Sequence, residues 1–239
     1  MRLLILFFIV FTTCSDAESF TINIVETYEG HTEQISIENI YTQLYAPLKI
    51  IPKLVYYPSK RGLRLVNQGV FDAEAGRFEL TAKHYPNLIK VNEPLDVFHS
   101  GFYCLNKEDC NIAANTNIVI LSSFQSAPAF CESSKLRCRF ESKPIAIVRM
   151  LEKGIAQAFL SSTIESNKVL CALQTDKLYF HNEPTLARLS YHFVNKRHVL
   201  LVPKLEHSMR QLKQKGLLPN TKVDSTPRHA SCGKDVIAV

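Results

Sequence analysis

The chain has 239 residues, of which 46% are hydrophobic and 21% are charged, and a formal net charge of +6. This composition excludes intrinsic disorder and suits one large domain or two domains of about 100 residues each. A positive charge suits an acidic partner, but the lysines and arginines are scattered and no aromatic pattern accompanies a basic stripe. We therefore expect no nucleic-acid binding.

The N-terminal segment has the pattern of a secretory signal peptide. MRLLILFFIVFTTCSDA carries an early positive charge, an apolar run and a small-x-small sequence that ends at Ala17. The run is shorter than the roughly 20 apolar residues of a membrane-spanning helix, and no later segment approaches that length. We expect residues 1–17 to be removed and the mature chain to be soluble. Lipid attachment at Cys14 is an alternative, but the residues before it lack the leucine-and-small-residue pattern of lipoproteins.

An even number of cysteines remains once Cys14 is removed, which predicts disulfides in an oxidising compartment. They are Cys104, Cys110, Cys131, Cys138, Cys171 and Cys232. The first two enclose a short polar loop, as do the next two, so we expect two local disulfides. The last two would then form the third, although other connectivities stay open. A zinc site is the alternative, but neither spacing is the tight hairpin that zinc sites favour.

Short β-branched runs alternate with helical patterns, which predicts α/β units around largely parallel sheets. In the first half we expect strands over 20–25, 54–59 and 70–76, with helices over 37–48 and from Ser59 to Gly69. In the second half we expect strands over 117–123 and 155–162, with a helix over 143–153. Leu201, Leu205, Met209 and Leu212 form an apolar stripe in a last helix, which would pack on the first domain.

One element occurs in both halves. LRLVNQGVFDAEAGR and VRMLEKGIAQAFLSS align without a gap when Gly154 is placed on Gly69, an offset of 85 residues. In each, a helix ends at the glycine and a buried strand follows. We therefore expect two lobes of the same plan. Residues 18–99 and 194–239 would form lobe one and residues 100–193 lobe two, with hinge segments at about 97–105 and 187–195.

The order of these segments resembles the bacterial periplasmic solute-binding proteins of family 3, which serve amino-acid ABC importers. The resemblance covers essentially the whole mature chain. It is carried by YPSKRGLRLVNQGVFDAEAGR, then YPNLIKVNEPL, a crossing strand, a second lobe, and YHFVNKRHVLLVPKLEHSMRQLKQKG. It implies an α/β, type 2 two-lobe fold, with each lobe a small sheet flanked by helices and two hinge strands between them.

The resemblance also implies a function. A periplasmic monomer without a cofactor or metal would close on a small polar solute, such as an amino acid, and deliver it to an ABC permease. The alternative is a sensory or regulatory protein of the same fold that signals to a membrane receptor. Catalysis has little support, since HExxH, GxSxG and phosphate-binding glycine loops are all missing. A Glu74-centred acid/base site is the remaining enzymatic alternative.

Candidate ligand-binding residues follow from where the strands end, because ligands bind such sheets at the carboxyl ends of parallel strands. Glu74 and Arg77 end the first repeat strand, where Arg77 would bind a carboxylate and Glu74 an ammonium group. Ser161 and Ser162 take the equivalent place in the second. The alternatives are a surface ion pair for Glu74 and Arg77, worth under about 1 kcal/mol, and turn residues for the serines.

Three further residues complete the predicted site. Tyr28 lies in a loop that is usually aromatic-rich in the family, and Ser122 opens the serine-rich loop that stands where the family has a glycine-serine loop. Helix N-terminal amides and serine hydroxyls receive carboxylates well. Arg61 would assist at the cleft. Their alternatives are a half-buried core tyrosine for Tyr28 and an exposed helix position for Arg61.

Overall fold

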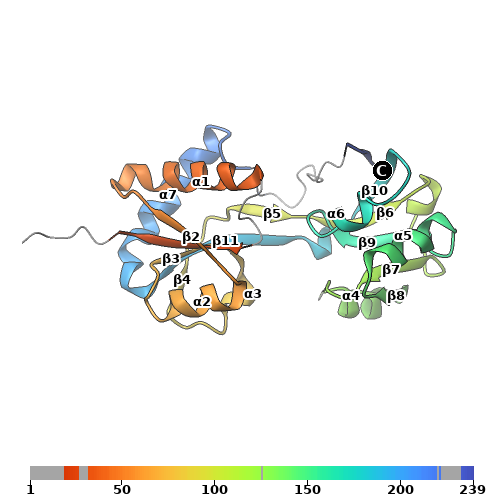
Figure 1. The fold of residues 1–239 in the computed structure, drawn as a ribbon, viewed down its shortest axis with the longest axis horizontal. Helices are drawn as coiled ribbons and strands as arrows, with labels where there is room; N and C mark the ends of the chain where they lie inside the picture. Colours follow the sequence, from red (N-terminus) through yellow and green to blue (C-terminus); the bar gives the residue numbers. More distant parts are fainter. Residues whose placement is uncertain (1–18, 27–31, 125, 220, 222–232) are drawn as a thin grey trace, which may run out of the picture.

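The computed structural model describes residues 19–26, 32–124, 126–219, 221 and 233–239. The predicted signal peptide, Tyr28 and Cys232 lie outside them. Among the described residues, every helix is too short or too polar to cross a membrane. Two six-stranded sheets, each flanked by helices, form two bodies that lie side by side (Figure 1). We call the first sheet with its helices lobe one and the second lobe two.

Lobe one has a sheet of order β2-β1-β3-β11-β4, with β5 paired to β11. Its strands are β1 (Thr21–Val25), β2 (Lys53–Tyr57), β3 (Ala73–Phe78), β4 (Leu88–Lys90), β5 (Asp96–Phe98) and β11 (Arg188–Asn195). Its helices are α1 (Thr32–Tyr45), α2 (Ser59–Asn67), α3 (Glu79–Ala82) and α7 (Val202–Gln214), with 3-10 turns at Ala46–Leu48 and Lys196–Leu201. Helices α1 and α7 cover one face of the sheet, and α2 and α3 cover the other (Figure 1).

Lobe two has a sheet of order β12-β10-β6-β9-β7-β8. Its strands are β6 (Ser100–Cys104), β7 (Asn117–Leu121), β8 (Arg137–Glu141), β9 (Ala158–Ser162), β10 (Lys177–Asn182) and β12 (Asp235–Ala238). Its helices are α4 (Ala127–Ser134), α5 (Pro144–Glu152) and α6 (Asn167–Leu170), with 3-10 turns at Glu108–Cys110 and Pro184–Leu186. The parallel triplet β8-β7-β9 matches β2-β1-β3 of lobe one. Because β11 and β6 run antiparallel to their neighbours, both sheets are mixed rather than largely parallel.

The predicted repeat is confirmed. Helices α2 and α5 occupy equivalent ranges at the offset of 85 residues, and β3 and β9 begin at Ala73 and Ala158, at the same offset. Gly69 and Gly154 end the two helices with φ of 77° and 66°, a left-handed conformation that glycine adopts at no steric cost. The repeat therefore encodes a helix, a glycine stop and the third strand of each parallel triplet.

The core of lobe one follows the alternation of β1. Ile22 and Ile24 are fully or nearly fully buried against Tyr41 and Leu44 of α1. Helix α7 adds its apolar stripe to the same core, as predicted. Asn23 lies between the two isoleucines and is also fully buried. Because neighbouring strand residues face opposite sides, it points toward α2.

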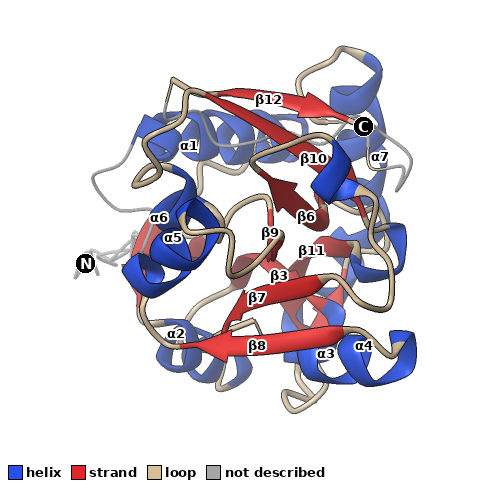
Figure 2. Ribbon diagram, turned by 90° about the vertical axis from the view of Figure 1, so that its right-hand side faces the viewer, coloured by secondary structure: helices blue, strands red, loops and turns tan. Residues whose placement is uncertain are grey.

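The strand pairing corrects the predicted lobe boundaries. Strand β12 pairs with β10 in lobe two, whereas we expected the whole C-terminal segment in lobe one (Figure 2). Val236 of β12 packs against the core of lobe two, and this burial of an otherwise exposed sheet edge explains its position. All of β11 pairs in lobe one, so that lobe resumes at Arg188 rather than at residue 194.

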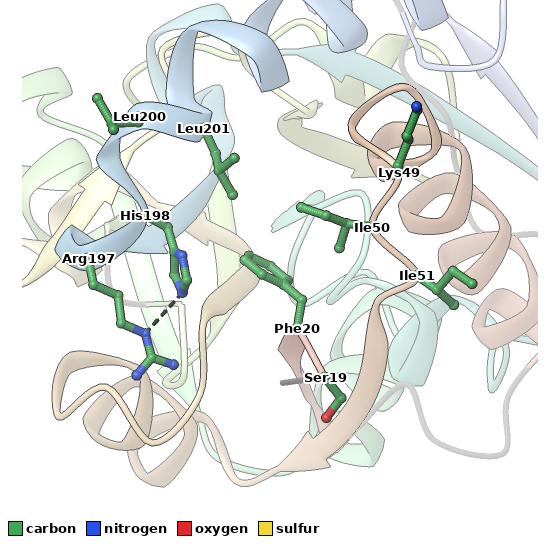
Figure 3. Close-up of a pocket in the computed structure, with 9 residues that line it drawn as sticks. All are labelled: Ser19, Phe20, Lys49, Ile50, Ile51, Arg197, His198, Leu200 and Leu201. Carbon is green, nitrogen blue, oxygen red and sulfur yellow. Dashed lines mark hydrogen bonds between the residues drawn. The ribbon is translucent and has the colours of Figure 1, made fainter. Parts of the chain in front are cut away.

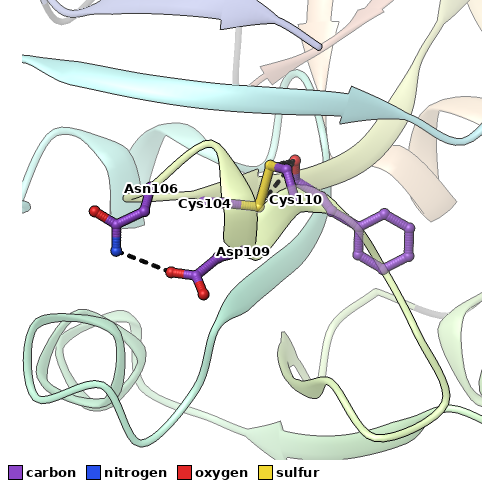
Figure 4. The surroundings of a disulfide bond; sticks show 5 residues. Cys104, Asn106, Asp109 and Cys110 are labelled. Carbon is purple, nitrogen blue, oxygen red and sulfur yellow. Dashed lines mark hydrogen bonds between the residues drawn. A yellow bond between two sulfur atoms is a disulfide. The ribbon is translucent and has the colours of Figure 1, made fainter.

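The two predicted local disulfides are confirmed. Cys104 is bonded to Cys110 (Figure 4) and Cys131 to Cys138. Both lie in lobe two, within one of its core clusters. Cys171 is also disulfide-bonded, but its expected partner lies outside the described residues, so that pairing stays a prediction. Among the described residues, no group of three or more histidine, cysteine or acidic side chains is placed to hold a metal.

Candidate functional site

The repeat strands of the two lobes end at the same place, where the chain crosses between the sheets. At the carboxyl end of β3, Phe78 pairs with Ser190, which pairs in turn with Asp96 of β5. At the carboxyl end of β9, Ser162 pairs with Ser100, the first residue of β6. Only His99 separates β5 from β6. The crossing therefore brings together the strand ends at which such sheets bind ligands.

A buried polar cluster lies near the end of β3. Glu74 Oε1 forms an ion pair with Arg77 Nη2 at 2.5 Å, and the two side chains are 0% and 9% exposed. Asn23 Nδ2 donates to Glu74 Oε2 at 2.8 Å, and Arg77 Nη1 donates to the Gly76 carbonyl at 2.9 Å. The predicted ion pair exists, but it is buried, so the surface alternative is wrong.

A β-bulge places Glu74 and Arg77 on the same face of the sheet. Phe193 pairs with Glu74 and Tyr191 pairs with Arg77, so that two residues of β3 lie opposite the single residue His192. Regular alternation would place residues three apart on opposite faces. The extra residue in β3 reverses the alternation, and Arg77 meets Glu74.

His192 contacts the bulge from the other face. Its Nδ1 lies 2.8 Å from the Glu74 carbonyl and 3.1 Å from the Ala75 carbonyl. Its Nε2 lies 2.7 Å from the hydroxyl of Tyr45 on α1. Because both carbonyls can only accept, Nδ1 carries the proton, and Nε2 accepts from Tyr45.

Burial shifts the pKa of both titratable groups. Desolvation raises the pKa of Glu74 to about 7, although Arg77 and the Asn23 hydrogen bond act in the opposite direction. Desolvation lowers the pKa of His192 to about 4, although its contacts with Ala75 and Glu74 oppose the shift. Near neutral pH, His192 is therefore uncharged, while Glu74 is close to its titration midpoint.

The other predicted site residues are distributed around the same strand ends. Ser161 is fully buried, and its Oγ has no hydrogen-bond partner among the described residues. Ser162 is half-buried and accepts from the Glu165 backbone at 3.2 Å. Ser122 is exposed directly after β7, and Arg61 is exposed at the start of α2, over the Tyr57 ring. Glu74 has no exposed surface and so cannot contact a ligand ammonium in this conformation.

Sequence reasoning missed three residues of this cluster: Asn23, Tyr45 and His192. Asn23 carried a usable signal, because a polar residue between two buried isoleucines has to find a partner inside the protein. His192 and Tyr45 carried none, since a bulge in a distant strand brings them to the site.

The larger of the two cavities described lies at the opposite end of lobe one. It has a volume of about 660 Å³ and is lined by Ser19, Phe20, Lys49, Ile50, Ile51, Arg197, His198, Leu200 and Leu201 (Figure 3). Beside it, Asp72 binds Arg197, His198 and the Thr21 backbone N–H. Burial acts to raise the pKa of Asp72, but these hydrogen bonds outweigh it and lower the pKa. A smaller cavity of about 220 Å³ also lies in lobe one, between α1 and the end of α7.

No family model and no curated protein matches the sequence. Solved structures do match. The L-cystine solute receptor of Neisseria gonorrhoeae, in its unliganded open conformation, aligns at 16% identity with a TM-score of 0.65, covering 83% of this chain and 89% of that one. A polar amino acid ABC uptake transporter substrate-binding protein from Streptococcus thermophilus aligns at 12% identity with a TM-score of 0.59, covering 83% and 82%.

A histidine kinase sensor domain with similarity to periplasmic binding proteins aligns at 10% identity with a TM-score of 0.51, covering 83% of this chain and 92% of that one. The chain has the two-lobe periplasmic-binding-protein fold. At these identities the likeness concerns the fold alone. The predicted fold class and the structural resemblance to family 3 are thereby confirmed.

Proposed function

We propose that this chain is a periplasmic solute-binding protein that captures a small polar solute with a carboxylate group, such as an amino acid, between its lobes. The observation that carries the proposal is the meeting of the carboxyl ends of β3 and β9 at the crossing between the sheets. Arg77 lies at the first of these ends, and Ser161 and Ser162 at the second. The cystine receptor and the polar amino acid binding protein share this fold.

Arg77 is the carboxylate anchor in this proposal. Its Nε has no hydrogen-bond partner among the described residues. A buried guanidinium N–H without a partner is uncommon in folded proteins, and a ligand carboxylate would supply the acceptor in a bidentate geometry. Ser161 is as buried as Glu74, so its Oγ would act as a donor from lobe two only in a conformation that exposes it. Arg61, Ser122 and Ser162 would line the rim of the same site.

Glu74 takes a different role from the one we expected from the sequence. Its carboxylate is the counter-ion that holds Arg77, rather than the partner of a ligand ammonium. Full burial also weakens the enzymatic alternative, because an acid/base group has to reach its substrate. Binding without chemistry is the function that this geometry supports best.

Export and delivery are the remaining parts of the proposal. The N-terminal signal pattern and the disulfides of lobe two support an oxidising, periplasmic location. An ABC permease is the proposed partner of the monomer. The alternative is a membrane receptor, favoured by the sensor domain of the same fold. Measuring ligand uptake by cells that lack this protein would distinguish the two partners. Uptake should fall if the partner is a permease and should not change if it is a receptor.

A thermal-shift screen of the L-amino acids and small dicarboxylates tests the binding function. A ligand at 100 times its dissociation constant stabilises the fold by about 2.7 kcal/mol. The Arg77→Gln variant should lose the shift, whereas Arg139→Gln, at an exposed ion pair in lobe two, should keep it. The proposal fails if no carboxylate compound raises the melting temperature, or if Arg77→Gln retains the full shift.

A further inference from the structure

We propose that His192 is a positioning residue of the candidate site, because it holds the β-bulge that turns Arg77 toward Glu74. The bulge is observed in the structure, whereas ligand binding at this place rests on the proposed function above. His192 lies on the opposite face of β11 from Phe193 and Tyr191, so it would act through the backbone and not by touching a ligand.

The alternation of β3 shows what the bulge changes. Ala73 and Ala75 belong to the core that α1 and α7 cover. Glu74 faces the side of α2, where its partner Asn23 lies against Gly62. In a regular strand, Arg77 would follow Ala73 and Ala75 into that apolar core. The bulge opposite His192 places Arg77 beside Glu74 instead. The pairing of Arg77 with Glu74 therefore depends on one extra residue in the strand.

His192 supplies the hydrogen-bond donor that the bulge needs. A bulge disrupts the ladder locally, and buried carbonyls without donors are costly. The His192 Nδ1–H lies within reach of two successive carbonyls of β3, those of Glu74 and Ala75. One ring thus satisfies both carbonyls at the point where the alternation reverses.

The surroundings of His192 hold the ring in the one state that can do this. The ring is fully buried, and its Nε2 contacts the Tyr45 hydroxyl. The centroid of the Tyr41 ring lies 5.4 Å from the centroid of the His192 ring. Because Tyr45 donates to Nε2, the proton stays on Nδ1, where the bulge carbonyls lie. Tyr45 from α1 therefore supports the tautomer that the two carbonyls of β3 already require.

Three variants test the proposal. His192→Leu keeps an apolar side chain of similar size but removes the donor. His192→Asn retains an amide N–H near the position of Nδ1. Tyr45→Phe is the matched control, since it removes one hydroxyl and leaves the Nδ1 donor in place. The measured quantity is the rate at which phenylglyoxal modifies Arg77 at pH 8, followed by peptide mass spectrometry, with the exposed Arg139 as an internal standard.

We expect His192→Leu to raise the modification rate of Arg77 by at least about tenfold, because loss of the bulge separates Arg77 from Glu74 and opens the region locally. His192→Asn and Tyr45→Phe should stay within about threefold of the wild type. A folded His192→Leu variant whose Arg77 is as protected as in the wild type overturns the proposal. So does an increase of the same size in Tyr45→Phe.

A measurement on the wild-type protein covers the case in which His192→Leu does not fold. Nitrogen NMR of the histidine rings at pH 7 should show His192 protonated on Nδ1, with a slowly exchanging ring proton. A ring protonated on Nε2 overturns the proposal. The arginine and NMR readouts need no ligand, so they stand even if the solute screen fails. If a solute is found, His192→Leu should weaken its binding by more than His192→Asn does.

Discussion

Glu74 and Arg77 lie three positions apart on one strand and still meet on the same side of the sheet, with 2.5 Å between Oε1 and Nη2. The pair is almost completely buried, and Asn23 completes it. Burying two charges costs solvation free energy that their attraction only partly offsets, and removal of one partner is more costly than replacement of both. The pair is thus a sensitive point of lobe one.

The first prediction concerns Arg77→Ala. Without Arg77, the Glu74 carboxylate is buried and unpaired, so its pKa should rise above the present value of about 7. We expect a loss of roughly 3 to 5 kcal/mol in unfolding free energy at pH 8, where Glu74 would otherwise be ionised, and a clearly smaller loss at pH 6, where it is protonated. Urea unfolding at the two pH values measures this. Arg139→Ala, at an exposed pair, should cost under about 1 kcal/mol at both. Equal losses at the two pH values for Arg77→Ala would contradict the prediction.

The second prediction concerns opposite pH dependences. Because the pKa of Glu74 is raised from 4.5 to about 7, its contribution to stability is present below pH 4.5 and is lost as the pH rises to 7. Because the pKa of His192 is lowered from 6.5 to about 4, its contribution is present above pH 6.5 and is lost as the pH falls to 4. The two trends oppose each other in the wild type.

Single variants should separate these trends. Glu74→Gln removes the contribution of Glu74 and leaves that of His192, so unfolding free energy should fall by on the order of 2 kcal/mol as the pH is lowered from 6.5 to 4.5. His192→Asn leaves the contribution of Glu74, so unfolding free energy should rise as the pH is lowered over the same range. Guanidinium titrations at closely spaced pH values measure both slopes. Slopes of the same sign in the two variants would show that one of the assignments is wrong.

The third prediction concerns Gly62, which lets α2 approach Asn23. A Cβ at this position would lie 2.1 Å from Asn23 Nδ2. Glycine to alanine inside a helix normally stabilises by about 1 kcal/mol, but here we expect a net loss of roughly 1 to 3 kcal/mol from overpacking. Gly62→Ala should cost less unfolding free energy in an Asn23→Ala background than in the wild type, since the clashing amide is gone. Additive losses in thermal denaturation would rule out the contact as the cause.

The fourth prediction concerns the disulfides of lobe two. Peptide mapping without reduction should recover Cys104 joined to Cys110 and Cys131 joined to Cys138. For loops this short, each bond should contribute about 2 kcal/mol by restricting the unfolded chain. Reduction should therefore increase hydrogen exchange in β6, β8 and α4 more than in β1 and α1, which lie in the other lobe. Equal increases in the two lobes would show that the bonds do not act locally.

Local patterns determined much of this protein. The offset of 85 residues between Gly69 and Gly154 predicted the helix, glycine stop and strand of each lobe, because glycine adopts the left-handed stop at no steric cost. The spacing of four cysteines predicted two disulfides, since short polar loops bring their ends together. Apolar periodicity predicted that α7 packs on lobe one. Each of these signals is contained in a few neighbouring residues.

Tertiary structure decided what depends on strands far apart in the chain. A bulge arises from the register between β3 and β11, whose partners Arg77 and Tyr191 are distant in sequence. Gly76 in AEAGRF is compatible with a bulge, since a strand glycine often marks one, but it does not specify the register. The burial of Glu74 beside Asn23, and the position of His192 beneath them, follow from that register. The return of β12 to lobe two is likewise a pairing with β10 that four residues of edge strand do not specify. Periodicity within a segment thus predicts which face is buried, whereas the partner across the sheet decides which polar groups meet.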